Sequence, residues 1–225
     1  MWRWIIRSII LLFIGLVLTA CWAHQPRPQL VTSTKADALA QRVMAAVGDS
    51  AWRRLNTVTF TFRGLRYEWS VRQKRVVMGK AEAAIRLDLA SQTCHRISEG
   101  SPLGQKACQG KFRRWHNDSF WLHPFGKLFD PGVKRALCDV DHDGQVEPWL
   151  CIRFSQGGDT PGDTYAIKIG ADGRPVAWKM WVEILPIGGL YTQWADWQSL
   201  PGGAWFAGTR ELSLYSIPIQ LISAH

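Results

Sequence analysis

The sequence carries none of the short motifs that most often mark catalytic or cofactor sites. It has no G-x-S-x-G nucleophile elbow, no phosphate-binding glycine loop, and no zinc-type spacing among its six histidines. These absences exclude the familiar serine hydrolases, phosphate-loop proteins and zinc modules. His116, Asp118 and Ser119 are hydrolase residue types, but closeness in sequence is not triad geometry. We therefore predict no catalytic residues, no metal and no cofactor, and keep a hydrolase with an unrecognised site as one alternative.

Acidic residues are scarce as well, and the chain has no internal repeat and no low-complexity block. Asp and Glu number 18 against 27 Lys and Arg, which gives a net charge of +9. Such an excess attracts anionic lipid headgroups or nucleic acid. A chain of 225 residues without repeats has room for one domain with a sizeable core.

The N-terminus has the pattern of an export signal. Two arginines precede an apolar run at residues 9–18, which is shorter than a membrane-spanning helix, and small residues follow it. The letters LTAC at 18–21 resemble the lipobox of bacterial lipoproteins. That resemblance implies a signal peptide at residues 1–20, cleavage before Cys21 and diacylation of this cysteine. An ordinary signal peptide or an N-terminal membrane anchor is the alternative.

The residues around the predicted cleavage site indicate the charge and the cellular location of the mature chain. Arg3 and Arg7 leave with it, so the net charge falls from +9 to +7. Two acyl chains suffice for stable membrane anchoring, and export argues against a nucleic-acid partner. Trp22 stands where an enterobacterial inner-membrane retention signal has Asp, and this resemblance implies the periplasmic face of the outer membrane. Residues 21–34 are polar and contain proline, which is typical of a lipidated tether.

Four further cysteines indicate disulfides, because an even number in an oxidising compartment is usually structural. Three pairings of these four are possible. We favour Cys94 with Cys108 and Cys138 with Cys151, since each pair brackets a turn-rich segment between strand-like runs. The functional alternative is a thiol nucleophile at Cys94, beside His95.

One amphipathic helix is predicted before the strands begin. Apolar residues recur every four positions from Leu39 to Val47, with Thr34 as the predicted cap and Gly48 as the predicted stop. A second short turn of helix is expected from Ser50.

After this helix the apolar period changes to two, which indicates strands. Apolar residues occupy even positions from Val58 to Phe62 and odd positions from Leu65 to Val71, so we predict a bulge at Gly64 within one long strand. Later alternating runs are separated by turn letters such as ADG at 171–173. Roughly eight to eleven antiparallel strands in sequence order predict a mainly β fold at residues 35–225, a curved antiparallel sheet or unclosed β-barrel covered by short helices.

Residues 117–133, NDSFWLHPFGKLFDPGV, are rich in aromatic residues, prolines and glycines. Prolines exclude a central strand, so we predict a short helix or looped cover across the open side of the sheet, begun by Asn117 and Asp118. The cover would bury Phe120, Trp121, Leu128 and Phe129. Eleven tryptophans beyond the leader either pack a solid core or line a cavity below this cover.

The same stretch carries a family resemblance. NDSFWL, then KLFDPGV, then TPGDTY at 160–165 resemble blocks shared by a generally uncharacterised group of exported bacterial lipoproteins. The resemblance covers about residues 36–212. The group's fold is similar to that of the lipoprotein carriers LolA and LolB, which implies an unclosed antiparallel barrel with helices plugging a hydrophobic cavity. No carrier-specific functional motif transfers residue by residue.

An acidic run offers one metal alternative. Asp139, Asp141, Asp143 and Gly144 match the first half of a calcium loop, but its twelfth position is Leu150 in place of a carboxylate. We interpret the run as a polar hairpin tip, with calcium binding as the alternative.

We expect a monomeric, outer-membrane lipoprotein that binds acyl chains or another hydrophobic ligand, lipid or lipoprotein in its open barrel. The alternatives are a structural or protein-interaction lipoprotein with a solid aromatic core, and an exported hydrolase. The predicted ligand-binding residues are Phe60, Phe62, Tyr67, Trp69, Trp121, Leu122, Phe125 and Leu128.

Overall fold

The structure is a computed structural model that describes residues 2, 4–9, 11–12, 15, 24–156 and 160–225. The predicted cleavage site and Cys21 lie outside the described residues. Within these ranges, no helix has both the length and the apolar character needed to cross a membrane.

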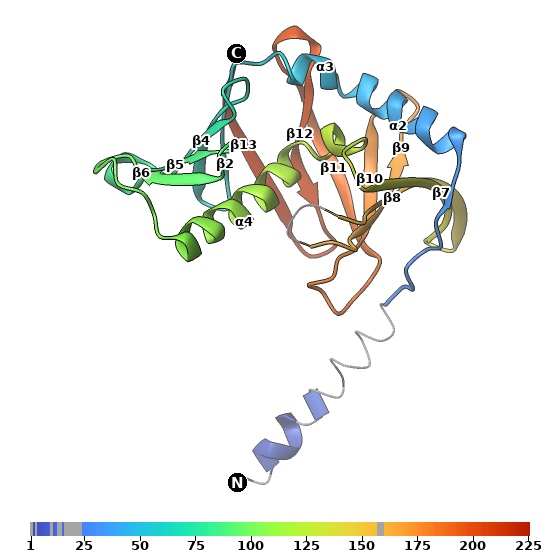
Figure 1. The fold of residues 1–225 in the computed structure, drawn as a ribbon. Helices are drawn as coiled ribbons and strands as arrows, with labels where there is room; N and C mark the ends of the chain where they lie inside the picture. Colours follow the sequence, from blue (N-terminus) through green and yellow to red (C-terminus); the bar gives the residue numbers. More distant parts are fainter. Residues whose placement is uncertain (1, 3, 10, 13–14, 16–23, 157–159) are drawn as a thin grey trace.

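The described residues form thirteen strands in one antiparallel sheet (Figure 1). Its strand order is β1-β7-β8-β9-β10-β11-β12-β13-β2-β3-β4-β5-β6, and the edge strands β1 and β6 do not pair with each other within the described chain. The strands are β1 (Val31–Thr32), β2 (Thr57–Phe62), β3 (Leu65–Ser70), β4 (Arg75–Met78), β5 (Ile85–Asp88), β6 (Thr93–Arg96), β7 (Val133–His142), β8 (Gln145–Phe154), β9 (Thr164–Ile169), β10 (Pro175–Trp181), β11 (Leu190–Ser199), β12 (Trp205–Glu211) and β13 (Ser216–Ala224). The predicted mainly β, unclosed antiparallel sheet is confirmed.

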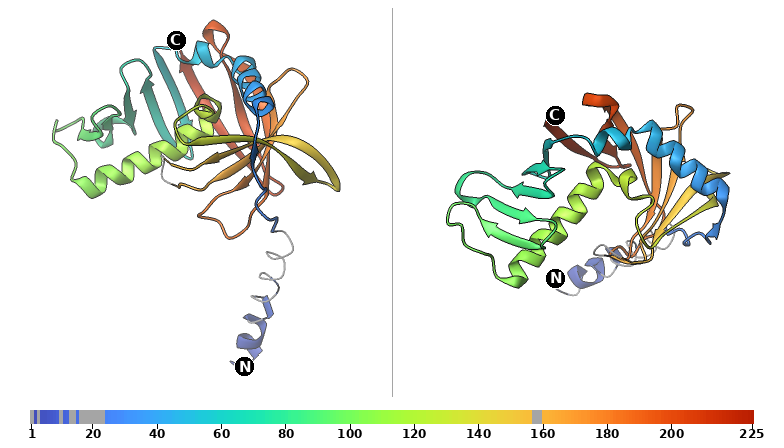
Figure 2. Two further views of the ribbon diagram at one scale, coloured as in Figure 1. Left: turned by 45° about the vertical axis from the view of Figure 1, so that its right-hand side comes forward. Right: turned by 45° about the horizontal axis from the view of Figure 1, so that its top comes forward.

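Two antiparallel meanders, β2–β6 and β7–β13, join side by side where β13 pairs with β2. The helices are α2 (Thr34–Ala46), α3 (Asp49–Trp52) and α4 (Gln105–Leu122), with short 3-10 turns η1 (Ala81–Ala83), η2 (Pro124–Lys127) and η3 (Pro201–Gly203). The sheet curves strongly, and α4 lies across its hollow side (Figure 2).

The first helix forms as predicted, with a different cap. Ser33 is the N-cap in place of Thr34, and its hydroxyl oxygen accepts a hydrogen bond from the Ala36 backbone N–H at 3.3 Å. Gly48 ends the helix with a φ of 66°. A Cβ at this position would lie 2.1 Å from the Gly203 carbonyl oxygen, so the close approach to η3 requires glycine.

The predicted bulge at Gly64 is wrong, because the chain reverses there. Phe62 pairs with Leu65, and Arg63 and Gly64 both have positive φ angles, which is the geometry of a two-residue hairpin. A hairpin and a bulge both move the apolar residues from even to odd positions. Phe60 and Tyr67 therefore still share one face, now as cross-strand partners.

The predicted cover is part of a longer helix. α4 begins at Gln105, so Asn117 and Asp118 lie inside it and do not cap it. Phe129 is exposed, against the prediction, and the Arg135 guanidinium lies 4.2 Å from the centroid of its ring.

Two apolar cores lie on the hollow side of the sheet, and a third lies on its outer side. The first core packs β2–β5 against α3 and α4. The second packs α2 and η2 against β8–β11. On β8, Leu150 and Ile152 belong to the second core, whereas Trp149 and Cys151 belong to the outer core, as strand alternation requires.

The predicted disulfide pairing is confirmed. Cys94–Cys108 links β6 to α4, so Cys108 lies on a helix and not beside a strand as expected. Cys138–Cys151 links β7 to β8.

The acidic run forms the tip of the β7–β8 hairpin. His142 pairs with Gln145, and Asp143 and Gly144 make the turn with positive φ angles. Glu147 is engaged by Lys168, with 2.6 Å between carboxylate and ammonium. Across the described ranges, no group of three or more His, Cys, Asp or Glu side chains is arranged to hold a metal ion.

Candidate ligand-binding cavity

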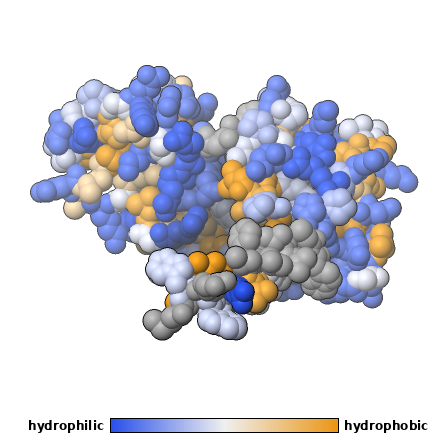
Figure 3. All heavy atoms as spheres, turned by 90° about the horizontal axis from the view of Figure 1, so that it is seen from below, coloured by the Kyte–Doolittle hydropathy of each residue, from blue (hydrophilic) through white to orange (hydrophobic). Residues whose placement is uncertain are grey.

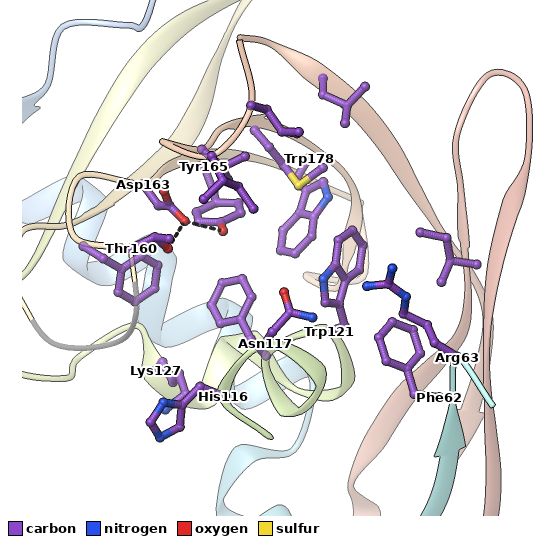
Figure 4. A pocket seen from close by; sticks show the side chains of 18 of the residues that line it. Phe62, Arg63, His116, Asn117, Trp121, Lys127, Thr160, Asp163, Tyr165 and Trp178 are labelled. Atoms are coloured by element: carbon purple, nitrogen blue, oxygen red, sulfur yellow. Dashed lines mark hydrogen bonds between the residues drawn. The ribbon is translucent and has the colours of Figure 1, made fainter. Parts of the chain in front are cut away.

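A cavity of about 1280 Å³ lies between α4 and the hollow side of the sheet. Residues from Thr61 to Gln220 line it, drawn from the β2–β3 hairpin, α4 and the second meander (Figure 4). Ligand pockets are commonly ~300–1,000 Å³, so this volume can hold more than one alkyl chain or a bulky hydrophobe.

Aromatic rings form the inner wall of the cavity. Phe120 stacks on Trp178 at 5.9 Å between ring centroids, and Trp121 meets the same indole edge-on at 5.5 Å. Tyr165 lies 5.0 Å from Trp178. Figure 4 shows Trp121 and Trp178 facing the open space from opposite elements, one from α4 and one from β10. Such a wall offers apolar surface to an alkyl chain and few groups that would compete for hydrogen bonds.

The helical repeat explains why α4 contributes to this wall. Arg113, Asn117, Phe120 and Trp121 all line the cavity, and their spacings of four, three and one place them on one face of the helix. Phe112 and Trp115 lie on the other side, in the first core. Along the cavity face the residues change from cationic to aromatic over about 12 Å, at ~1.5 Å per residue.

Three cationic side chains lie at the rim of the cavity, with Arg63 and Lys127 on different sides of it (Figure 4). Arg63, Arg113 and Lys127 line the cavity. Lys127 is 3.7 Å from a carboxylate oxygen of Asp130. Within the described chain, no carboxylate lies within ion-pair distance of Arg63 or Arg113, so the rim carries positive charge that an anionic group could neutralise.

Asp163, from the TPGDTY block, is the buried polar group of the wall. Its carboxylate accepts hydrogen bonds from the Thr160 hydroxyl at 2.6 Å and from the Glu183 backbone N–H at 2.9 Å. Burial, followed by the charge of Asp163, raises the pKa of Tyr165, so this phenol stays neutral. These bonds join the start of β9 to the loop after β10 and hold the wall in place.

A buried carboxylate fixes α4 over the sheet. Asp118 is fully buried, and its Oδ2 accepts hydrogen bonds from the Tyr67 hydroxyl at 2.5 Å and from Arg114 Nε at 2.7 Å. Asn117 Nδ2 donates to Oδ1 at 2.8 Å. Burial and the bond to Asp118 raise the pKa of Tyr67. Tyr67 thus holds α4 in position and does not line the cavity.

A buried arginine holds the C-terminal end of α4. Arg210 donates to the Trp121 carbonyl oxygen at 2.6 Å and to the Ala207 carbonyl oxygen at 2.7 Å. Its guanidinium lies 3.7 Å from the ring centroid of Trp194, and burial lowers its pKa. The cation therefore faces the negative end of the helix dipole and holds the last turn of α4 in place.

The eight predicted ligand-binding residues separate into three places. Phe62 and Trp121 line the cavity. Four pack in or against the first core, and two pack in the second core. The first-core residues are Phe60, Tyr67, Trp69 and Leu122; the second-core residues are Phe125 and Leu128.

Sequence reasoning missed much of the aromatic wall. Phe154, Tyr165 and Trp178 line the cavity, although only the last two lay in runs predicted as strands, the two alternating runs on either side of residues 171–173. The period-two pattern of Tyr165 with Ile167, and of Trp178 with Met180, was the available signal for an inward face. Which inward positions border open space depends on the path of α4, which no local pattern reveals.

The hydrolase residue types do not assemble into a triad. Asp118 is bound by Tyr67 and Arg114, and the Ser119 hydroxyl donates to the His116 backbone carbonyl oxygen at 3.3 Å. Cys94, the alternative nucleophile, is in a disulfide.

Comparisons with known proteins add one structural likeness. No protein-family model and no curated protein matches the chain. A crystal structure described as a "putative outer membrane lipoprotein-sorting protein domain" from Vibrio parahaemolyticus aligns with a TM-score of 0.37 and 11% identity, over 83% of this chain and 92% of that one. Similarity at this level transfers no residue roles, so the site is interpreted from its own geometry.

Proposed function

We propose that this protein is a lipid-anchored envelope protein that binds acyl chains or another hydrophobic ligand in the cavity under α4. Two disulfides fit an oxidising compartment, and the LTAC sequence at 18–21 supports anchoring through Cys21 on the periplasmic face of the outer membrane. The role is that of a binding or carrier protein, not of an enzyme, and it acts as a monomer.

The aromatic wall is the observation that carries this proposal. Each methylene that leaves water for such a wall contributes about 0.8 kcal/mol, so a ten-methylene segment contributes about 8 kcal/mol before ordering costs. The positive rim complements an acidic or phosphorylated headgroup. A solid aromatic core, the alternative interpretation, would leave no volume of about 1280 Å³ beside Trp121 and Trp178.

Substitution of Trp121 by Asp tests the proposal. Trp121 is half-buried and lines the cavity, so a carboxylate there should cost ligand binding more than stability. We expect the Kd for an apolar fluorophore or for oleate to rise about thirtyfold, which corresponds to about 2 kcal/mol. The measurement is a fluorescence titration of the two proteins, with circular dichroism to show that both are folded.

Trp197→Asp is the matched control. Trp197 is also half-buried, packs beside Trp194, and does not line the cavity. Its substitution should leave the Kd unchanged within twofold. A wild-type protein that takes up neither ligand, or equal effects of the two substitutions, would refute binding in this cavity.

A further inference from the structure

The segment expected to be a loose tether lies against the sheet. Gln25 N–H donates to the Gly188 carbonyl oxygen at 2.9 Å, and the Gln25 carbonyl oxygen accepts from Trp181 Nε1 at 2.9 Å. The Gly188 N–H donates to His24 Nδ1 at 3.0 Å. Further along, β1 pairs with β7. The N-terminal segment, residues 24–32, is therefore bound to the domain from its first described residue.

This contact leaves very little chain between the domain and the predicted anchor. From Cys21 to His24 there are three peptide steps, which span at most about 11 Å. A lipidated Cys21 would therefore hold His24, and the Gly188 backbone bound to it, close to the membrane surface.

The lining of the main cavity extends to the same place. His24 and Leu185 line one small hollow, and Leu185 also lines the main cavity. We name the two neighbouring connections the mouth loops: residues 182–189 between β10 and β11, and residues 212–215 between β12 and β13. Both contribute to the cavity lining.

The mouth loops expose large apolar side chains to solvent. Leu214 is 92% exposed, Ile184 74% and Tyr215 60%. Figure 3 shows the molecule from below, the side on which the N-terminal residues also lie, with hydrophobic patches between more hydrophilic lobes. Burial of a Leu or Ile side chain is worth about 1.5–3 kcal/mol, so these residues gain most in contact with lipid. The cationic rim, with Arg63 and Arg113, complements anionic headgroups there.

We propose that the mouth loops dock on the lipid bilayer, so that the anchored protein holds its cavity open toward the membrane interior. The inference rests on the proposed anchoring through Cys21 and adds an orientation to it. A ligand could then pass between bilayer and cavity without crossing water.

Depth-dependent fluorescence quenching tests this orientation with the full, exported protein. An environment-sensitive dye is attached to Leu214→Cys, since the four cysteines of the domain are in disulfides. The protein is reconstituted in vesicles of phosphatidylethanolamine and phosphatidylglycerol that carry a quencher on their acyl chains. The control carries the dye at Arg54→Cys, an exposed position after α3 at the opposite end of the domain (Figure 1). Mass spectrometry first establishes whether Cys21 is acylated.

We expect quenching at position 214 to exceed quenching at position 54 at least fivefold. Insertion of about twenty Gly/Ser residues before His24 should reduce quenching at 214 severalfold, because such a linker spans ~25 Å on average. Acylated protein with equal quenching at both positions, or with quenching at 214 that the insertion leaves unchanged, would overturn the docking while the anchor stands. Unmodified Cys21 would overturn the anchor together with the orientation.

Discussion

The bond between Tyr67 and Asp118 should be a main determinant of stability, because it holds the helix that covers the cavity. Tyr67→Phe keeps the ring that stacks on Phe60 at 4.8 Å and removes only the hydroxyl. A hydrogen bond to a buried carboxylate contributes about 1.5–3 kcal/mol. With a urea m-value of about 2–3 kcal/mol/M, the midpoint of urea unfolding should fall by about 0.5–1.5 M.

The control for this prediction is Tyr191→Phe. The Tyr191 hydroxyl accepts a bond from Gln193 at 3.2 Å on the exposed surface, so its loss should change the unfolding free energy by less than ~0.5 kcal/mol. A double-mutant cycle with Asp118→Asn isolates the pair, and we expect a coupling of at least about 1 kcal/mol. A change below ~0.5 kcal/mol for Tyr67→Phe would refute the view that this carboxylate fixes α4.

Three further predictions concern pH, charge and the disulfide. His123, the residue after α4, is buried beside Asp49, with 3.1 Å between His123 Nε2 and Asp49 Oδ1. Burial lowers the pKa of His123 below its ordinary value, so below about pH 6.5 the unfolded chain binds a proton that the folded chain does not, and stability should fall as the pH falls, by up to ~1.4 kcal/mol per pH unit. In urea unfolding at several pH values His123→Gln should flatten this slope, and an unchanged slope would contradict the prediction. Arg63→Glu with Arg113→Glu should weaken oleate binding about tenfold and leave oleyl alcohol binding unchanged in the same titration; equal losses would show that the pair shapes the cavity rather than the headgroup site. Replacement of Cys94 and Cys108 by Ala should cost about 3 kcal/mol in urea unfolding, since the two are 14 residues apart, and no loss would mean that β6 and α4 stay together without the bridge.

Local patterns in the sequence predicted the elements well wherever one period dominates. The helix ending before Gly48 and the strand run from Val58 to Phe62 both follow from apolar spacing. The hairpin at Arg63-Gly64 was predicted as a bulge, because both devices shift the apolar positions by one. Only the pairing of Phe62 with Leu65 separates them, and pairing is a tertiary contact.

The cavity was harder to predict than the strands around it. Its wall joins α4 to strands far away in sequence. α4 itself was only partly predicted, because the polar residues Arg113 and His116 interrupt the run of apolar positions along the sequence. Tyr67 was assigned to the cavity from its strand face alone. The buried Asp118, four positions after Arg114, explains why it turns to the helix instead.

Composition alone did not predict that the N-terminal segment, residues 24–32, binds the domain. Its prolines and polar residues are typical of a flexible tether, yet Gln25 binds the backbone of Gly188 and the Trp181 indole. A Cβ at Gly188 would lie 2.4 Å from the Trp181 ring, so glycine there makes room for the contact. Such a requirement is visible only when both segments are placed.

Native mass spectrometry of the exported protein, with Cys21 replaced by Ser, tests hydrophobic-ligand binding in the cavity most directly. We predict that the folded protein carries a co-purifying lipid or takes up added oleate, and that Trp121→Asp loses it. A protein that is folded, empty and unable to bind added lipid would contradict the account and favour a partner protein at its surface.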